Sequence, residues 1–541
     1  MKRKLILGIH ASFTANTHDP SICLIDNGKI IFAAEEERFN RNKSSLGLLP
    51  YNAINSLLED KNISIKDIDL VVSTGTTNIY IKKKIINFFD SYFGYCPKVL
   101  IVNHAMSHAY GTFLSSGFEK SLVISIDGIG DKISTLVANG ARGKLKIIYK
   151  SSQIDESLGL FYGVFTNFLG FKRSEGEFKL MGMAALGKKK YNLDKYITIK
   201  KPFKISLNKK IYIKKFPMTT IIESLANTKY LTDKNLPHRN IASNKINQNH
   251  FDLAYAVQKK YEEIFEKIII KFKSNHKSIC ISGGCALNCL ANRILEKHFK
   301  NIYIMPASSD RGLSIGNAYI GAIKEKMPIK KVQSMFLGNK YNESEIKKIL
   351  INCNVKFRKC NSSKEAVKDI LNGKTVGWFK GRSEFGPRAL GGRSIIAYPQ
   401  IKNIKDKLNK KIKFREPYRP YAPAILTKYA KKIGIYNEYP YMTLAIDLSS
   451  MIKKNPVIKK IFGDSIHYDN TTRLLTVKDI KHPFYEILSN LEKRNKAPII
   501  INTSFNLSGE PIVETPRDAL RTFFSSGLDS LYIENFKIFK S

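Results

Sequence analysis

Residues 21–34 read SICLIDNGKIIFAA, two apolar runs joined by the pair Asn27-Gly28. Asn-Gly between apolar runs predicts a β-hairpin, because both residues tolerate the left-handed backbone of a type I′ turn. A third apolar run, LILGI at 5–9, precedes the hairpin and completes a three-stranded unit. The same order returns at 121–148, where strands are expected at 121–127, 134–137 and 145–148. The N-terminal part is therefore predicted to be an α/β domain built on a duplicated strand unit.

Apolar patterns further along the chain predict the remaining elements. Helices are expected at 50–60 and 253–270, and strands at 99–102, 278–282 and 498–501. A helix is also expected from Ala286 onward. The periodicity lapses at 326–345, and we place a domain boundary there. The chain is therefore expected to form two domains, 1–335 and 346–541.

The composition limits the class of protein. A chain of 541 residues that is 43% apolar is long enough for two or more domains with large cores. No run approaches the roughly 20 apolar residues of a membrane span, and the first residues lack the apolar core of a signal peptide. Seven scattered cysteines favour reduced thiols over a disulfide framework. We expect a cytoplasmic protein without a membrane span.

The formal net charge is +43, which invites a nucleic-acid interpretation. The lysines are nevertheless spread along the whole chain among isoleucines and asparagines. We interpret most of this charge as solvated background and expect no nucleic-acid partner; an anionic substrate or surface is the alternative.

The stretch VNHAMSHA at 102–109 places His104 and His108 four residues apart. On a helix the two imidazoles share one face, where they can bind iron or zinc together with carboxylates from elsewhere. Asp127 ends an apolar strand, and Asp310 lies in a loop before a helix rich in small residues. Alone, the histidine pair is a weak signal, since ordinary buried histidines and helix-capping aspartates explain the same residues.

Two turns in the N-terminal part are candidate substrate sites. Gly283 and Gly284 follow a strand, so their backbone N–H groups are placed to face phosphate or adenosine. His18 lies in the first turn between strands, and Lys43 follows the charge run at 35–38. Structural turns and a solvated charge run are the alternatives.

The C-terminal part carries denser cationic signals. Lys380 and Arg382 lie in a glycine-rich segment, and Arg415 lies in the segment FREPYRP at 414–420. Such side chains suit phosphate oxygens. A polar site, NTSFN at 502–506, follows the expected strand at 498–501. Surface salt bridges or turns explain each of these segments by itself, but they explain the three segments together less well.

These motifs resemble the NodU/CmcH family of O-carbamoyltransferases, which includes the tobramycin carbamoyltransferase. The resemblance runs nearly end to end. Its shorter segments are HDPS at 18–21, EEERFNR at 35–41, HAMSHA at 104–109, SIDGIGD at 125–131, SLGLFYG at 157–163, EGEFKLMGMAALG at 175–187 and SGGCALN at 282–288. The most specific are FGPRALGGRSI at 385–395, FREPYRPYAPAIL at 414–426 and NTSFNLSGEPIVETPRDA at 502–519.

The resemblance implies a reaction in two stages. A C-terminal α/β domain similar to threonylcarbamoyl-adenylate synthases would convert carbamoyl phosphate and ATP, with Mg²⁺, into carbamoyl-adenylate. A duplicated actin/Hsp70-like N-terminal domain would then transfer the carbamoyl group to the hydroxyl of a natural product, sugar or glycan. The resemblance also leaves room for a homodimer.

The resemblance further implies roles for particular residues. An Fe²⁺ or similar divalent ion would be held by His104, His108, Asp127 and Asp310. His18 would act as general base for the acceptor hydroxyl. The remaining implied ligands of the nucleotide and carbamoyl phosphate are Lys43, Gly283, Gly284, Lys380, Arg382, Arg415, Asn502, Ser504 and Asn506.

Two other functions are compatible with parts of the sequence. A tRNA-modifying enzyme of the threonylcarbamoyladenosine type would use similar domains, and a non-catalytic nucleotide-binding scaffold would retain the fold. The blocks at 414–426 and 502–513 favour the carbamoyltransferase. The acceptor is not identified by any motif, and we expect residues 190–250 to help select it.

Overall fold

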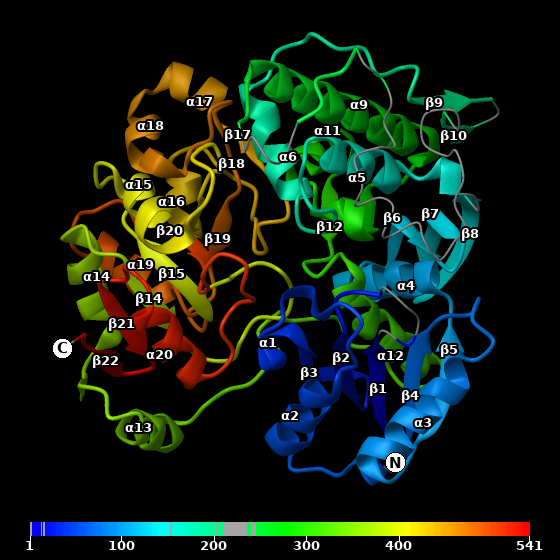
Figure 1. The fold of residues 1–541 in the computed structure, drawn as a ribbon, viewed down its shortest axis with the longest axis horizontal. Coiled ribbons are helices and arrows are strands. Elements are labelled where there is room, and N and C mark those ends of the chain that lie inside the picture. The colour runs from blue at the N-terminus through cyan, green and yellow to red at the C-terminus, as the bar shows by residue number, and fades with distance from the viewer. Residues whose placement is uncertain are drawn as a thin grey trace. The chain divides into compact units, whose positions relative to one another are not determined.

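The computed structural model describes residues 3–11, 13, 17–151, 154–201, 203–208, 233, 235–239 and 245–540. They form two compact units, whose elements are labelled in Figure 1. The first unit comprises Met1–Glu36, Ser45–Ile54 and Asn62–Gln333, and the second comprises Glu37–Ser44, Asn55–Lys61 and Ser334–Ser541. Much of the segment 190–250, expected to select the acceptor, lies outside the described residues.

The first unit contains two five-stranded sheets of the same topology, with orders β3-β2-β1-β4-β5 and β8-β7-β6-β11-β12. In each sheet the first three strands are antiparallel, and the last two continue parallel to the third. The strands are β1 Leu5–His10, β2 Ser21–Asp26, β3 Lys29–Glu35, β4 Leu70–Thr74, β5 Lys98–Val102, β6 Lys120–Gly130, β7 Ile133–Ala141, β8 Lys144–Ser151, β11 Ser278–Ser282 and β12 Asn301–Ile304, with a separate hairpin of β9 Ile197–Lys200 and β10 Lys204–Leu207. The duplicated three-stranded unit is thus confirmed.

Two helices of this unit pack tightly on one another and on the sheets. The helices here are α3 Ile81–Phe93, α4 His104–Ser116, α5 Leu158–Phe168, α6 Glu177–Met183, α9 Gln248–Phe272, α10 Cys289–Asn292, α11 Leu295–His298 and α12 Leu313–Lys324, while α2 Tyr51–Lys61 begins in this unit and belongs to the second unit from Asn55 onward. A Cβ atom on Gly316 of α12 would lie 1.9 Å from the Ser107 carbonyl oxygen of α4, so the two backbones touch. Thr112 of α4 donates a hydrogen bond to the Ile281 carbonyl of β11. Helix α4 is therefore fixed between α12 and the second sheet.

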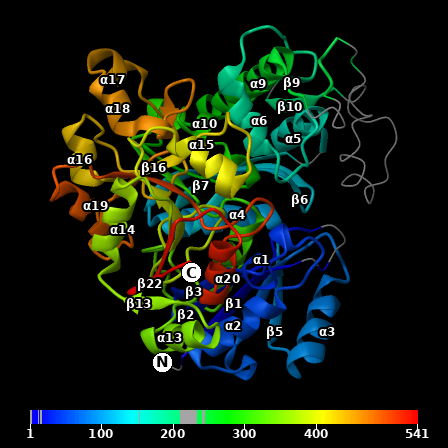
Figure 2. The same cartoon turned by 60° about the vertical axis from the view of Figure 1, so that its left-hand side comes forward.

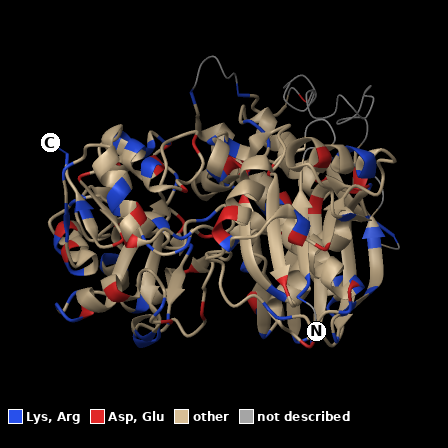
Figure 3. Cartoon of the chain, turned by 90° about the horizontal axis from the view of Figure 1, so that it is seen from below, with Lys and Arg blue, Asp and Glu red and all other residues tan. Residues whose placement is uncertain are grey.

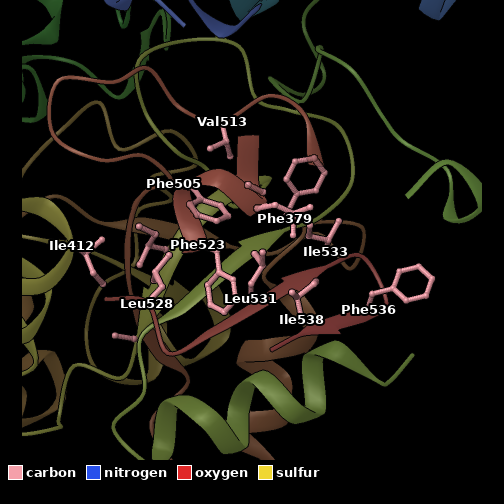
Figure 4. Packing of buried hydrophobic residues seen from close by; sticks show 14 of the residues in the cluster. Phe379, Ile412, Phe505, Val513, Phe523, Leu528, Leu531, Ile533, Phe536 and Ile538 are labelled. Carbon is pink, nitrogen blue, oxygen red and sulfur yellow. The ribbon is translucent and has the colours of Figure 1, made fainter. Parts of the chain in front are cut away.

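The second unit is built on one eight-stranded sheet of order β13-β22-β21-β14-β15-β20-β16-β19. Its strands are β13 Phe357–Lys359, β14 Val376–Phe379, β15 Arg393–Ala397, β16 Ala422–Leu426, β19 Leu475–Val477, β20 Ile499–Ser504, β21 Ser530–Ile533 and β22 Phe536–Ile538, beside a small ribbon of β17 Ile446–Asp447 and β18 Thr471–Thr472. Its helices are α1 Glu37–Asn40, α13 Glu343–Asn352, α14 Ser362–Leu371, α15 Ile404–Leu408, α16 Thr427–Lys432, α17 Ser449–Lys454, α18 Val457–Phe462, α19 Tyr485–Glu492 and α20 Pro516–Phe524. Phe379, Phe505 and Phe523 pack with aliphatic side chains in its core (Figure 4).

The segment 37–44 belongs to the second unit because two arginines anchor it there. Arg38 is almost fully buried and donates hydrogen bonds to the Glu384 and Gly386 carbonyls, at 3.3 and 2.8 Å. Arg41 donates to the Ile512 and Pro511 carbonyls, at 2.7 and 2.8 Å. Lys43, which the sequence analysis grouped with the N-terminal domain, therefore lies in the second unit.

The structure also corrects two expected elements. The strand expected at 498–501 runs from Ile499 to Ser504, so Asn502 and Ser504 lie on it and not after it. The helix expected from Ala286 is only a short turn at Gly284–Leu287, followed by the four-residue α10.

The charged residues are spread through the structure as they are spread along the sequence. Lysines and arginines are distributed over the whole ribbon among acidic residues (Figure 3). Among the helices that the structure describes, none is long and apolar enough to cross a membrane.

Arg38→Met is expected to lower the free energy of unfolding by about 1–3 kcal/mol, because the buried Glu384 and Gly386 carbonyls lose a charged donor. Urea unfolding of the full chain measures this change. Arg3→Met is the matched control, since Arg3 is exposed and pairs with Asp26 at the surface; it should shift stability by less than about 0.5 kcal/mol. Equal unfolding midpoints for the two variants would contradict the anchoring role.

Candidate functional site

Four side chains of the first unit converge on one small space. His104 Nε2 and His108 Nε2 lie 3.1 and 3.2 Å from Asp127 Oδ2. The same nitrogens lie 3.5 and 3.6 Å from Asp310 Oδ1. One ligand atom from each of the four residues lies within 4.8 Å of the others. The structure thus brings together the four residues that the sequence analysis selected as metal ligands.

The local sequence explains how helix α4 presents its histidines. Asn103 caps the helix, its side chain accepting from the Met106 N–H, so both imidazoles project from the first turns on one face. Asp131 accepts from the His104 N–H at 2.9 Å and from Thr76 and Thr77. Although burial raises the pKa of Asp131, these hydrogen bonds hold it below its usual value. An ionised Asp131 therefore fixes the start of α4.

Glycines let the backbone approach the cluster. A Cβ atom on Gly130 would lie 2.2 Å from the His104 ring, so a larger residue there would displace the imidazole. Gly283 has a φ of 86° and its Cβ would meet the Ile126 carbonyl at 2.2 Å. This turn points the Gly284 N–H at Asp127 Oδ1, 3.2 Å away. The Gly283-Gly284 turn thus orients a candidate metal ligand, while its predicted role toward adenylate stays a prediction.

The electrostatics of the cluster suit a cation. Burial raises the pKa values of Asp127 and Asp310, but hydrogen bonds and the positive charge of the imidazoles hold both well below their usual range. Burial lowers the pKa of His108, yet its hydrogen bonds to both carboxylates raise it to about 9. Two carboxylates with two imidazoles form a mixed oxygen and nitrogen donor set, which fits Fe²⁺ or Zn²⁺.

His18 lies beside this cluster and is paired with an aspartate. Its Nδ1 is 3.3 Å from Asp19 Oδ2, and Asp19 is in turn held by Arg311 at 2.6 Å. Burial lowers the pKa of His18, but the charge of Asp19, with smaller contributions from Asp310 and Asp127, raises it to about 9. Sequence reasoning missed Asp19 and Arg311, although each stands next to a selected residue in the chain.

His10 is a further residue that the sequence analysis did not select. Its Nε2 lies 3.1 Å from the His18 carbonyl oxygen and 3.7 Å from Asp310 Oδ2. Burial lowers its pKa to about 4, which makes its imidazole neutral at physiological pH. No motif marked it, because it is the last residue of an otherwise apolar strand.

In the second unit a buried lysine joins polar residues at the end of β20 and just after it. Lys413 Nζ donates to the Asn506 side chain at 2.7 Å and to the Ser504 hydroxyl at 3.3 Å. The Ser504 hydroxyl donates to Asn506 Oδ1 at 2.7 Å. Burial and the positive charges of Arg415, Arg419 and Lys43 hold the pKa of Lys413 well below its usual value. Sequence reasoning missed Lys413, which stands one residue before the selected segment 414–420.

Local backbone geometry aims this lysine inward. Lys413 ends a π-helical turn, Asn409–Lys413, and the following Phe414 has a φ of 43°. Both features are uncommon and concentrate at functional sites. Arg415 follows, with its guanidinium stacked 3.8 Å from the centre of the Tyr421 ring.

The other selected residues of this unit have structural partners. Lys380 contacts Glu534 and Asn535, each at 3.1 Å. Arg382 contacts Asp60 and the Gly338 carbonyl. Asn502 is buried and donates to the Ala389 carbonyl at 2.8 Å. The contacts of Lys380 and Arg382 do not include Ser504 or Asn506, so their direct role toward substrate stays a prediction.

Comparison with known proteins gives a consistent match over both units. Residues 5–92 and 76–319 match the family model described as Carbamoyltransferase N-terminus, and residues 367–540 match Carbamoyltransferase C-terminus. Protein MJ1051 of Methanocaldococcus jannaschii is 33% identical over 99% of this chain and 100% of its own length. Nodulation protein NolNO of Sinorhizobium fredii is 31% identical over 97% of this chain and 79% of its own length.

A solved structure gives a weaker likeness. Full-length HypF in its phosphate- and nucleotide-bound form has a TM-score of 0.32 and 12% identity, over 59% of this chain and 55% of that chain. A likeness at this level supports no conclusion about function.

His104→Ala is expected to weaken binding of a divalent metal by at least about 100-fold, because it removes one of four converging donors. Metal content of the full chain, measured by mass spectrometry after loading with Fe²⁺ or Zn²⁺ and desalting, tests this. His298→Ala is the matched control, since that imidazole pairs with Glu266 away from the cluster. Retention of metal by His104→Ala at the level of the control would exclude the site.

Proposed function

The chain belongs to the carbamoyltransferase family, and on that premise we propose that it is an ATP-dependent O-carbamoyltransferase. It forms carbamoyl-adenylate from carbamoyl phosphate and ATP, and transfers the carbamoyl group to a hydroxyl of a small molecule or glycan. The observation that carries this proposal is a pair of separate sites. One is the His and Asp cluster of the first unit, and the other is the buried cation group around Lys413.

The second unit forms the adenylate in this proposal. Lys413 and Arg415 bind the phosphate oxygens of carbamoyl phosphate and of ATP with its Mg²⁺, and Ser504 and Asn506 orient them. Water releases inorganic phosphate from carbamoyl phosphate, and the carbamate oxygen attacks the α-phosphorus of ATP. The bond to the β-phosphate breaks, and pyrophosphate leaves. Lys43 supports this site, because it contributes to the positive potential at Lys413.

The first unit transfers the carbamoyl group. His104, His108, Asp127 and Asp310 would hold a divalent ion such as Fe²⁺, which would supply Lewis-acid polarisation of a carbonyl. His18 accepts the proton of the acceptor hydroxyl, and the contact of its Nδ1 with Asp19 holds the imidazole in place. Asp310 and Asp127 contribute to the raised pKa of His18, so neutralising their charge lowers that pKa, while Asp19 remains the larger cause of the increase.

The architecture agrees with this division of labour. The duplicated sheet topology of the first unit supports an actin/Hsp70-like transfer domain, and the eight-stranded sheet supports an adenylate-forming domain. We assign these roles to 1–335 and 346–541, with the segments 37–44 and 55–61 added to the adenylate-forming part.

The two half-reactions should separate by mutation. Lys413→Met is expected to lower carbamoyl-phosphate-dependent pyrophosphate release at least about 100-fold, since it removes a buried contact to charged substrate. His104→Ala should leave pyrophosphate release nearly unchanged while abolishing carbamoylated product. A coupled pyrophosphate assay with product detection by mass spectrometry measures both.

The matched control for Lys413 is Lys410→Met, an exposed cation of the same π-helical turn, which should behave as the wild type. If His104→Ala and Lys413→Met reduced pyrophosphate release equally, the assignment of the two steps to two units would be wrong.

A further inference from the structure

Arg173 stands next to the His and Asp cluster and has no role in the mechanism above. It lies in the loop between α5 and α6, two helices that are labelled in Figure 2. Its Nη2 is 3.2 Å from the position that a Cβ on Gly128 would take, and its Nε is 2.9 Å from the corresponding position on Gly163. Gly128 directly follows Asp127 in β6. The guanidinium therefore lies against the backbone that carries a candidate metal ligand, in space that two glycines leave open.

Among the residues that the structure describes, Arg173 makes no hydrogen bond and no ion pair. It is only partly exposed, and burial lowers the pKa of its guanidinium. The nearest carboxylates are engaged elsewhere: Asp127 accepts from both imidazoles and from the Gly284 N–H, and Glu177 accepts from the Ser174 N–H. Five donors on a partly buried cation without a partner are costly, which favours an anionic ligand at this place.

We propose that Arg173 binds the phosphate of the carbamoyl donor in the first unit, and thereby stabilises the leaving group; this rests on the proposed function. The acceptor oxygen forms a bond to the carbamoyl carbon, and the bond from that carbon to the phosphate oxygen breaks. The electron pair stays on the phosphate, the proton goes to His18, and AMP leaves. A guanidinium matches phosphate oxygens with paired hydrogen bonds.

The position of Arg173 favours the donor over the acceptor. The phosphate of carbamoyl-adenylate is bonded to the carbamoyl carbon itself, so it must lie beside any carbonyl held at the cluster. An acceptor hydroxyl, in contrast, requires no anionic group. A cation adjacent to Asp127 and Gly128 is placed where the donor phosphate has to be.

The test compares Arg173→Met and Arg173→Lys with Lys172→Met in the full chain. Lys172 is the matched control, since it is the preceding residue, exposed, and paired with Glu175 at the surface. Pyrophosphate release should be unchanged in all three. Carbamoylated product per pyrophosphate should fall about 10- to 100-fold in Arg173→Met, less in Arg173→Lys, and not in the control.

A binding measurement separates this inference from the proposed function. Calorimetry with AMP and with inorganic phosphate should show weaker binding at one site in Arg173→Met only, whether or not transfer is observed. A wild type that yields no carbamoylated product would refute the proposed function alone. If Arg173→Met bound AMP and phosphate as the wild type does and gave the same ratio of carbamoylated product to pyrophosphate, Arg173 would not bind the donor phosphate. A rise only in the KM of the acceptor would contradict that role as well. If Arg173→Met fails to fold, Arg173→Lys decides by the same measurements.

Discussion

Two partly buried carboxylates that share one small space are the constraint around which the first unit is arranged. Asp127 and Asp310 would repel each other in a low-dielectric interior unless positive charge lay between them. The imidazoles of His104 and His108 supply part of that charge. Strand β6 and the turn before α12 are thereby tied to helix α4. The binding of a divalent ion would use a charge imbalance that the fold already contains.

Close backbone packing keeps these groups at fixed distances. The contact of Gly316 with Ser107 leaves α4 and α12 no room to slide, and Asn317 of α12 also donates to the Ile9 carbonyl of β1. Because α12 follows Asp310 directly and α4 carries both histidines, the same packing sets the separation of the cluster's ligands. The contact between Gly316 of α12 and Ser107 of α4 thus fixes the distances between the candidate metal ligands, although it touches none of their donor atoms.

The sequence predicted the features that depend on local pattern. The hairpin at Asn27-Gly28, its repeat, and the histidine pair on one helix face all follow from spacing within a few residues. Features that depend on distant partners were missed. Lys413 meets Ser504 only after β20 has formed, and Arg38 finds its carbonyls 346 and 348 residues later in the chain. The contacts of Lys380 with Glu534 and of Arg382 with Asp60 were likewise not predicted, since these acidic residues are distant in the chain.

The discontinuous second unit has a consequence for how the protein is made. Arg38 leaves the ribosome 346 residues before Glu384, its partner, has been added. At about 5–20 residues per second, that gap corresponds to roughly 20–70 s of synthesis. During this time Arg38 and Arg41 lack the carbonyl groups that they bind in the finished second unit. The second unit can therefore be completed only after the C-terminal part of the chain has been synthesised, although its first residues are made near the start.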